Sequence, residues 1–356
     1  MGVHILATAA HRFNPDLILP MRGPCTNLTA KIHSLREFQS AMLVTVTLNT
    51  ALDKTLHVPG FSVGQHARAE LVSLIAAGKG INVARGIVRM GGTCVASGLV
   101  GTGEWERYSR VLEEEGVRCA LTGIDGVTRT NTTILDPKNN TTTHLREEGM
   151  TTRQEDLERL KDRILELLAD QPDGGLTRVV FAGSLPPGVS SEELIELIRM
   201  CREEGARTVL DTSGDTLYRA VESGMVDTIK PNLQELGQCL RREVEQEECP
   251  GVAARLLDRV DAVLLTLGAE GAYFLRAGER VGVRCRLESR EVANTVGCGD
   301  AFLAGWLEGR EHGKSPRSAL AWAAAAGAAS ARGQTTVDYS RSDVEELLAR
   351  CETLCP

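Results

Sequence analysis

The sequence predicts an α/β protein whose parallel sheet is covered by helices on both faces. From about residue 152 onward, amphipathic helical segments such as Glu155–Leu168 alternate with strand-like segments such as Arg178–Ala182, which is the pattern of βαβ units. Segments such as Val263–Leu267 are mostly apolar, as expected of strands buried on both faces. Polar motifs follow them directly, so these motifs gather at the carboxyl edge of the sheet, where ligands bind in folds of this class.

Composition argues against two classes of function. The 356 residues are 42% hydrophobic and 25% charged, with a formal net charge of −8, so the chain lacks the basic field of a nucleic-acid-binding protein. No apolar run approaches the ~20 residues that span a bilayer, and no membrane association is expected. The 10 cysteines are scattered without metal-ligand or redox-motif spacing, which indicates reduced thiols in a cytoplasmic protein.

The first 41 residues fit poorly with the rest of the chain. Prolines and a glycine interrupt them, and their apolar residues show no sustained period. We therefore expect a disordered extension or a mis-assigned start over residues 1–41, a folded domain over 42–345 and a C-terminal tail over 346–356.

The first half of the domain mixes strands of the main sheet with β-structure outside it. The run Leu43–Leu48 is rich in β-branched residues and predicts a strand, with the polar loop Asn49–Lys54 at its carboxyl end. Alternating apolar residues over His57–Ile75 predict β-structure outside the main sheet. The other segments predicted here are a helix over Ala77–Val88, a strand over Thr93–Gly101, a helix over Glu104–Glu115, and strands Gly126–Leu135 and Thr141–Arg146 around a turn at Asp136–Asn140.

The second half continues the alternation of helices and strands. Its predicted elements are the helix Glu192–Arg202, the strands Arg207–Asp211 and Val226–Ile229, the helix Val252–Val260, the strand Val263–Leu267 and the helix Pro316–Ala331. The last of these is rich in alanine and glycine, which suits either close helix packing or direct contact with a nucleotide base.

The segment Asn294–Gly305 carries the strongest indication of chemistry. Gly297 and Gly299 flank Cys298, and Asp300 follows at the start of an apolar helix. Bare N–H groups at a helix N-terminus favour anions, and a carboxylate beside them can accept a hydroxyl proton. This pattern suits phosphoryl transfer to an alcohol. An ordinary glycine-rich loop with an acid in the first helical turn explains the segment equally well.

Two further segments place polar groups at the same edge of the sheet. Asp53 follows the first strand and either holds sugar hydroxyls or forms a turn. Lys79 and Asn82 stand at the start of a glycine-opened helix, where they face either an anionic ligand or solvent. The segment Gly309–Ser315 does not match the Walker-type phosphate loop, because three residues rather than four separate Gly309 from Gly313.

Five motifs, in order, resemble those of the ribokinase (PfkB) family of carbohydrate kinases: Asp53, Ala77–Ala84, Gly183–Gly188, Lys230–Glu235 and Gly297–Asp300. The resemblance extends from about Met42 to Gln334, and within the family it is greatest to bacterial 1-phosphofructokinases and tagatose-6-phosphate kinases. It implies a three-layer αβα Rossmann-like domain with a small β-sheet lid drawn from about 57–75 and 117–146. Such a lid would cover the sugar, exclude water and carry a homodimer interface.

The resemblance also implies roles for individual residues. Asp300 would be the general base, beside an anion hole formed by Gly297, Cys298 and Gly299. The sugar would be held by Asp53, Gly78, Lys79 and Asn82, and its phosphate by Arg129. The ATP-binding residues would be Lys230, Asn232, Glu235, Thr266, Gly268 and Gly271, of which Asn232 and Glu235 would orient Mg²⁺ through water.

The implied reaction is the phosphorylation of fructose 1-phosphate to fructose 1,6-bisphosphate with ATP and Mg²⁺. A tagatose-6-phosphate or fructose-6-phosphate kinase is the alternative, since either substrate places its phosphate and its acceptor hydroxyl at opposite ends of a ketose. A catalytically silent sugar-phosphate sensor is a remote alternative. Such a sensor would not need a base or metal ligands, yet Asp300, Asn232 and Glu235 are all present. Three positions depart from the family pattern: Thr50 replaces a proline, Ala77 a glycine and Cys298 an alanine, the last adding a thiol open to oxidation.

Overall fold

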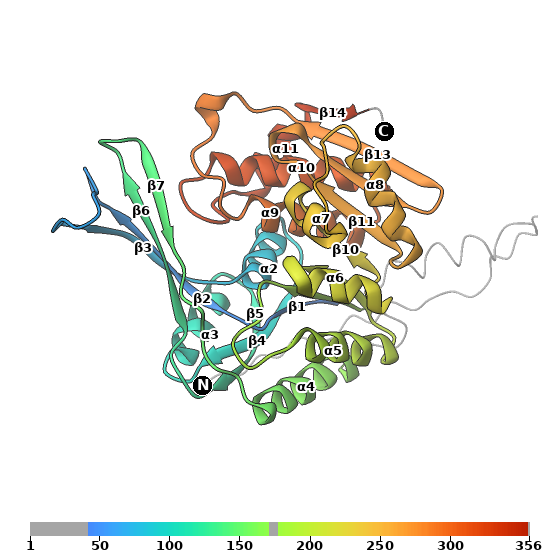
Figure 1. Cartoon of the computed structure of the whole chain (residues 1–356), viewed down its shortest axis with the longest axis horizontal. Helices are drawn as coiled ribbons and strands as arrows, with labels where there is room; N and C mark the ends of the chain where they lie inside the picture. The colour runs from blue at the N-terminus through green and yellow to red at the C-terminus, as the bar shows by residue number, and fades with distance from the viewer. Residues whose placement is uncertain (1–41, 171–176, 355–356) are drawn as a thin grey trace, which may run out of the picture. The chain divides into compact units, whose positions relative to one another are not determined.

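The structure of the chain is a computed structural model that describes residues 42–170 and 177–354, all within one structural unit (Figure 1). The expectation of a disordered extension over residues 1–41 lies outside the described residues. No helix in the described ranges is long and apolar enough to cross a membrane.

The described residues form a large sheet and a small one. The large sheet has the strand order β14-β13-β12-β11-β10-β9-β8-β1-β4-β5, and the small one has the order β3-β2-β6-β7. The strands are β1 (Leu43–Thr47), β2 (Ala51–His57), β3 (Glu70–Ala77), β4 (Val95–Gly101), β5 (Arg118–Ile124), β6 (Arg129–Asp136), β7 (Thr141–Leu145), β8 (Arg178–Ala182), β9 (Arg207–Asp211), β10 (Thr228–Ile229), β11 (Ala262–Thr266), β12 (Ala272–Arg276), β13 (Glu279–Cys285) and β14 (Cys351–Leu354).

Helices cover the large sheet on both faces, which confirms the predicted three-layer α/β architecture. One hydrophobic core lies under α2, α3, α9, α10 and α11, and the other lies under α4 to α8. Strand residues alternate between them: Leu43 belongs to the first core, whereas Val44 and Val46 belong to the second. The helices are α2 (Lys79–Arg89), α3 (Trp105–Glu114), α4 (Gln154–Ala169), α5 (Ser191–Glu203), α6 (Gly214–Ser223), α7 (Leu233–Leu240), α8 (Cys249–Ala253), α9 (Cys298–Glu311), α10 (Pro316–Arg332) and α11 (Arg341–Leu348), with short 3₁₀ helices η1 (Ala254–Asp258), η2 (Gly268–Glu270) and η3 (Ser289–Glu291).

The large sheet is parallel from β11 to β5 and antiparallel at its other edge. β12, β13 and β14 pair antiparallel in succession after β11. The predicted parallel sheet is confirmed from β5 to β11, whereas the antiparallel strands β12 to β14 were not predicted, because a short hairpin follows β11 in place of a crossover helix. The residues expected to form a C-terminal tail, 346–356, were assigned wrongly as far as they are described, since they complete α11 and form β14.

The small sheet, which we call the lid sheet, consists of β2, β3, β6 and β7. In Figure 1 it extends away from the large sheet. Its boundaries differ from the expected 57–75 and 117–146 in two respects. β5 pairs with β4 over its whole length and so belongs to the large sheet. β2 begins at Ala51, so that Asp53 lies on a lid strand and not in a loop.

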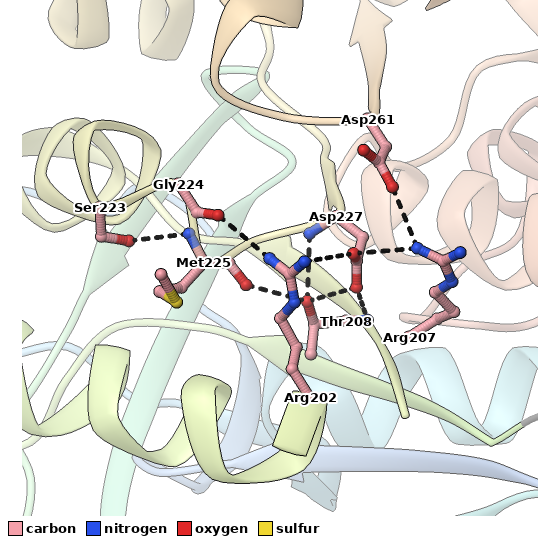
Figure 2. Close-up of polar contacts among 8 residues, drawn as sticks. All are labelled: Arg202, Arg207, Thr208, Ser223, Gly224, Met225, Asp227 and Asp261. Carbon is pink, nitrogen blue, oxygen red and sulfur yellow. Dashed lines mark hydrogen bonds and ion pairs between the residues drawn. The ribbon is translucent and has the colours of Figure 1, made fainter. Parts of the chain in front are cut away.

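A polar network joins the amino ends of the parallel strands β9, β10 and β11 (Figure 2). Asp227, which precedes β10, is buried and accepts hydrogen bonds from the N–H and the hydroxyl of Thr208 at 2.7 and 2.9 Å. Arg207 bridges Asp227 and Asp261, which precedes β11. Since the carboxylate of Asp227 is fully engaged by this network, we assign it to holding the strand ends in register.

Candidate active site

The helix α9 begins in a glycine-rich turn, as the sequence predicted. Gly297 has φ +82°, and a Cβ there would lie 2.5 Å from Cγ2 of Thr336, so the position requires glycine. The first hydrogen bond of α9 runs from the N–H of Ala301 to the carbonyl of Gly297 at 2.9 Å. The N–H groups before Ala301 have no intrahelical acceptor and bear the positive end of the helix dipole.

Asp300 lies buried in the first turn of α9. Its Oδ2 accepts a hydrogen bond of 2.8 Å from Nδ2 of Asn82, on α2. Burial and the negative charge of Asp211 raise the pKa of Asp300 to about 7, although Lys79 and the Asn82 hydrogen bond lower it. A carboxyl group with this pKa exchanges a proton readily near neutral pH, which is the property of a general base.

Two lysines meet at Asp211, a fully buried residue at the carboxyl end of β9. Its Oδ1 lies 2.9 Å from Nζ of Lys79, and its Oδ2 lies 3.1 Å from Nζ of Lys230. Burial raises the pKa of Asp211, but the two ammonium groups outweigh burial and hold the pKa below its usual range. Sequence reasoning missed Asp211 as a site residue; the available signal was an acid at the end of an apolar strand.

Lys230 connects this ion pair to the helix N-terminus. Its Nζ lies 3.5 Å from the position that a Cβ on Gly299 would occupy, and the residue is 4% exposed. The ammonium group of Lys230 and the first N–H groups of α9 therefore lie close to each other. Both favour negative charge, so the arrangement can bind a phosphate group.

Asn232 and Glu235 form the capping box of α7. Oδ1 of Asn232 accepts from the Glu235 N–H at 2.8 Å, and Oε2 of Glu235 accepts from the Asn232 N–H at 2.9 Å. Oε1 of Glu235 lies 3.9 Å from Nζ of Lys79, at the edge of the lysine cluster.

Asn232 and Glu235 offer few oxygen atoms that could bind Mg²⁺ directly. Within the described ranges, no group of three or more His, Cys, Asp or Glu residues could enclose a metal ion. One carboxylate oxygen of Glu235 is engaged by the helix cap and the other is not. This fits the expected water-mediated Mg²⁺, because Mg²⁺ keeps several waters and needs only one or two carboxylates.

The loop after β11 provides a second glycine-rich segment. The N–H of Thr266 donates to the carbonyl of Pro231 at 3.0 Å, which places this loop beside Asn232. Gly268 has φ +58°, and a Cβ placed there would meet no atom of the described residues within 4 Å outside its own turn. At Gly271, with φ +104°, a Cβ would lie 2.5 Å from the carbonyl oxygen of Val283. The turn is therefore tight on one side and open to a ligand on the other.

The lid sheet brings Asp53 and Arg129 together. Asp53 is paired in register with Asn131, whose Nδ2 donates to Oδ1 of Asp53 at 3.0 Å. Burial raises the pKa of Asp53 and lowers that of Arg129. Nε of Arg129 is buried and has no hydrogen-bond partner in the part of the chain that the structure describes. A buried donor left free in this way suits an anionic ligand.

Asn49 joins the lid sheet to the large sheet, a role that sequence reasoning did not assign. Its carbonyl accepts from Nη2 of Arg129 at 3.0 Å. Its Nδ2 donates to the carbonyl of Glu148 at 3.0 Å and to the carbonyl of Leu185 at 3.3 Å. Arg146, just after β7, was also missed; its positive charge helps to lower the pKa of Asp53.

Gly78 caps α2 with φ +137°, and a Cβ there would lie 2.7 Å from Cγ2 of Thr47. This close approach sets Lys79 and Asn82 at the helix start, as the sequence predicted. Burial raises the pKa of the Cys298 thiol to about 11, which favours its protonated form, and oxidation of this thiol stays a prediction. A thiol that stays protonated at neutral pH is a poor nucleophile.

The fold and this cluster define a phosphotransferase with an alcohol group as acceptor. A family model described as "pfkB family carbohydrate kinase" matches residues 46–341, and the chain belongs to this family. A 1-phosphofructokinase of Rhodobacter capsulatus is 36% identical over 267 residues, which cover 74% of this chain and 82% of that protein. A tagatose-6-phosphate kinase of Staphylococcus epidermidis is 28% identical, covering 88% and 99%. The structure of phosphofructokinase-2 from Escherichia coli in complex with substrates and products superposes with a TM-score of 0.80 at 26% identity, covering 87% and 99%.

Proposed function

We propose that the protein transfers the terminal phosphoryl group of ATP to a hydroxyl of a ketohexose phosphate, and that this substrate is fructose 1-phosphate. The observation that carries the proposal is the environment of Asp300: a buried carboxyl with a pKa of about 7, in the first turn of α9. The choice of sugar rests on the relatives named 1-phosphofructokinase, of which one is 36% identical.

In the proposed mechanism, Asp300 accepts the proton of the acceptor hydroxyl while Asn82 holds its carboxylate in place. The free N–H groups at the start of α9 stabilise negative charge that develops on the transferred group. Lys230 adds a positive charge on the same side, where Asp211 holds its ammonium group. Mg²⁺, when bound beside Glu235, would neutralise charge on the nucleotide phosphates. Thr266, Gly268 and Gly271 would line the nucleotide.

The lid sheet would recognise the sugar phosphate. Asp53 accepts hydrogen bonds from the sugar hydroxyls, alongside Gly78 and Lys79 at the start of α2. Arg129 binds the phosphate that the substrate already carries, through the donor that has no partner within the described chain. Desolvating this guanidinium is costly unless an anion meets it, which supports a phosphorylated sugar over a free one.

A tagatose-6-phosphate or fructose-6-phosphate kinase is the second candidate. The tagatose-6-phosphate kinase relative aligns over 99% of its own length, and Arg129 could serve a phosphate at either end of a ketose. The deciding experiment is a coupled ADP-release assay with Mg-ATP and four acceptors: fructose 1-phosphate, fructose 6-phosphate, tagatose 6-phosphate and free fructose. We expect the highest kcat/KM with fructose 1-phosphate. Preference for a 6-phosphate would select the second candidate, and activity on free fructose alone would contradict the role of Arg129.

We also propose a homodimer that forms through the lid sheet. Leu71 and Leu145 are 56% and 54% exposed on its two edge strands. In the strand register Leu71 pairs with Leu56, Leu56 with Ile134, and Leu145 with Thr132. Leu56, Thr132 and Ile134 alternate with Asp53 and Arg129 along β2 and β6, so these positions and their partners share the face opposite to the proposed sugar contacts. Leu71 joins this face through a register shift between Thr55 and Leu56. An apolar face of this kind is typical of a protein–protein interface.

A further inference from the structure

Two cysteines oppose each other across the antiparallel pair of β13 and β14. Cys285, the last residue of β13, is paired in register with Cys351, the first residue of β14. The N–H of Arg286 donates to the carbonyl of Arg350 at 3.3 Å, so the adjacent Cys285–Cys351 pair occupies a non-hydrogen-bonded position. The Cα atoms of such pairs are about 4.5 Å apart, which lies within the roughly 4.4–6.8 Å that a disulfide requires.

The two thiols converge on one point. Sγ of Cys285 lies 3.5 Å from the carbonyl oxygen of Leu347, and Sγ of Cys351 lies 3.6 Å from the same atom. Both side chains are half-buried at the edge of the large sheet, and neither forms a disulfide. The pair thus has the register, the side-chain direction and the access that oxidation to a disulfide needs.

The surroundings make the two sulfur atoms unequal. A hydrogen bond from Cys351, together with the positive charge of Arg350, holds the pKa of the Cys285 thiol below its usual value. The same hydrogen bond and burial raise the pKa of Cys351. A more acidic thiol beside a less acidic one is the arrangement in which the first attacks an oxidant and the second resolves the product.

We propose that Cys285 and Cys351 are a redox-modification site, which a low-molecular-weight disulfide converts into a reversible cross-strand disulfide. The thiolate of Cys285 attacks one sulfur of the small disulfide, forms a mixed disulfide and releases one small thiol. The thiolate of Cys351, having lost its proton to solvent, then attacks Sγ of Cys285 and releases the second small thiol. Two protein thiols are oxidised and one small disulfide is reduced to two thiols, so electrons and protons balance.

The cross-link would enclose residues 286–350, which include the whole of α9 and α10. It would form beside Arg350, whose Nη1 binds both carboxylate oxygens of Glu291 at 2.9 Å. Because the strands already stand at disulfide spacing, we expect oxidation to stabilise the C-terminal edge without displacing Asp300. Closing a loop of this length should raise Tm by roughly 5–10 °C, with kcat changed less than about twofold.

The test equilibrates the full-length reduced protein with mixtures of glutathione and glutathione disulfide, followed by intact mass and peptide mapping. The wild type should lose the mass of two hydrogen atoms, gain the Tm increase and return to its starting state with a reducing agent. Cys355→Ser and Cys119→Ser are matched controls that should behave as the wild type does. Mapping with Cys355→Ser is needed because the C-terminal tryptic peptide contains both Cys351 and Cys355.

The variants Cys285→Ser and Cys351→Ser should each lose both the internal disulfide and the Tm increase. In Cys351→Ser, the mixed disulfide with glutathione should accumulate on Cys285, since nothing resolves it. Melting of each reduced variant checks that it is folded, and Cys285→Ala and Cys351→Ala replace any serine variant that is not. The proposal is overturned if the folded wild type keeps all its thiols or carries only unresolved glutathione adducts. It is also overturned if Cys285→Ser or Cys351→Ser still forms the internal disulfide.

Discussion

Asn82 and Asp300 are separated by 218 residues in sequence, yet Nδ2 of Asn82 donates to Oδ2 of Asp300 at 2.8 Å. The bond joins the starts of α2 and α9, two helices that each begin after a glycine with positive φ. It engages Oδ2 of the Asp300 carboxylate, and in the proposed mechanism the group that accepts the substrate proton is this carboxylate. The same contact lowers the pKa of Asp300, against the larger effect of burial.

Replacing Asp300 with Asn should separate activity from stability. We expect kcat to fall by about 10²–10⁴, the scale of a positioned base. Burial raises the pKa of Asp300 to about 7, so ionisation costs the folded state stability as the pH rises toward and through that value. The variant without ligands should therefore gain Tm, and gain more at about pH 8 than at about pH 5. Unchanged turnover would remove Asp300 from the proposed mechanism.

The pH dependence of the reaction should reflect the same group. Asp300 must be ionised to accept a proton, so kcat/KM for the sugar phosphate should fall as the pH drops below about 7. The second ionisation of a phosphate monoester lies near pH 6, which allows the two effects to be distinguished. Initial rates between about pH 5 and pH 9 measure the profile. A flat profile through pH 7 would be inconsistent with this assignment.

Asp211→Asn should weaken both the fold and the site. It leaves Lys79 and the buried Lys230 without their shared counter-charge, and breaking a buried ion pair costs about 3–5 kcal/mol. The negative charge of Asp211 also raises the pKa of Asp300, so the acid limb of the pH profile should move to lower pH. Asp215→Asn, at an exposed ion pair on α6, is the control for thermal and chemical unfolding. Equal stability of the two variants would refute this reading of Asp211.

Arg129→Ala should act on the sugar phosphate and not on the nucleotide. Loss of a charge-assisted contact should raise KM for the sugar phosphate roughly 10- to 100-fold, with KM for ATP little changed. Arg110→Ala, on the exposed side of α3, should leave both constants as they are. Steady-state kinetics with each substrate varied in turn provide the measurement. If KM for the sugar phosphate stays the same, another cation, such as Arg146, binds the phosphate.

Leu71→Asp and Leu145→Asp should dissociate the proposed dimer. A charge placed on each exposed apolar position should oppose burial of the lid-sheet face. Light scattering across a concentration series gives the mass, and Val127→Asp, at an exposed position outside the lid sheet, is the control. A wild type that remains monomeric at high concentration would exclude this interface.

Sequence patterns predicted the elements whose signals are local. The strands β1 and β8 are short, mostly apolar runs, and the turn before α9 shows its glycines directly. The antiparallel edge was missed because β12 and β13 form a hairpin that contains no helical pattern to contrast with it. β5 was assigned to the lid because nothing in its own residues says which sheet it joins; that is decided by its pairing with β4.

The site residues also differ in whether a local sequence pattern identifies them. The resemblance to a kinase family supplied Asp300, Lys79 and Lys230, each within a recognisable motif. Asp211 stands outside those motifs, and its importance depends on two lysines that approach it from α2 and from the end of β10. Sequence alone does not predict that two lysines lie close to Asp211, because this proximity depends on how strand ends and helix starts pack.

Asn49 connects two parts of the molecule, the lid sheet and the large sheet, whose residues can be substituted separately. Asp53 and Arg129 stand on the lid sheet, whereas Asp300 and Lys230 belong to the large domain. Under the proposed function, substitutions on β2, β6 and β7 should therefore change the preferred acceptor while the groups proposed for phosphoryl transfer stay as they are. A lineage built on this plan can acquire new sugars by changing a few strand residues, and its members should differ most where the lid faces the substrate.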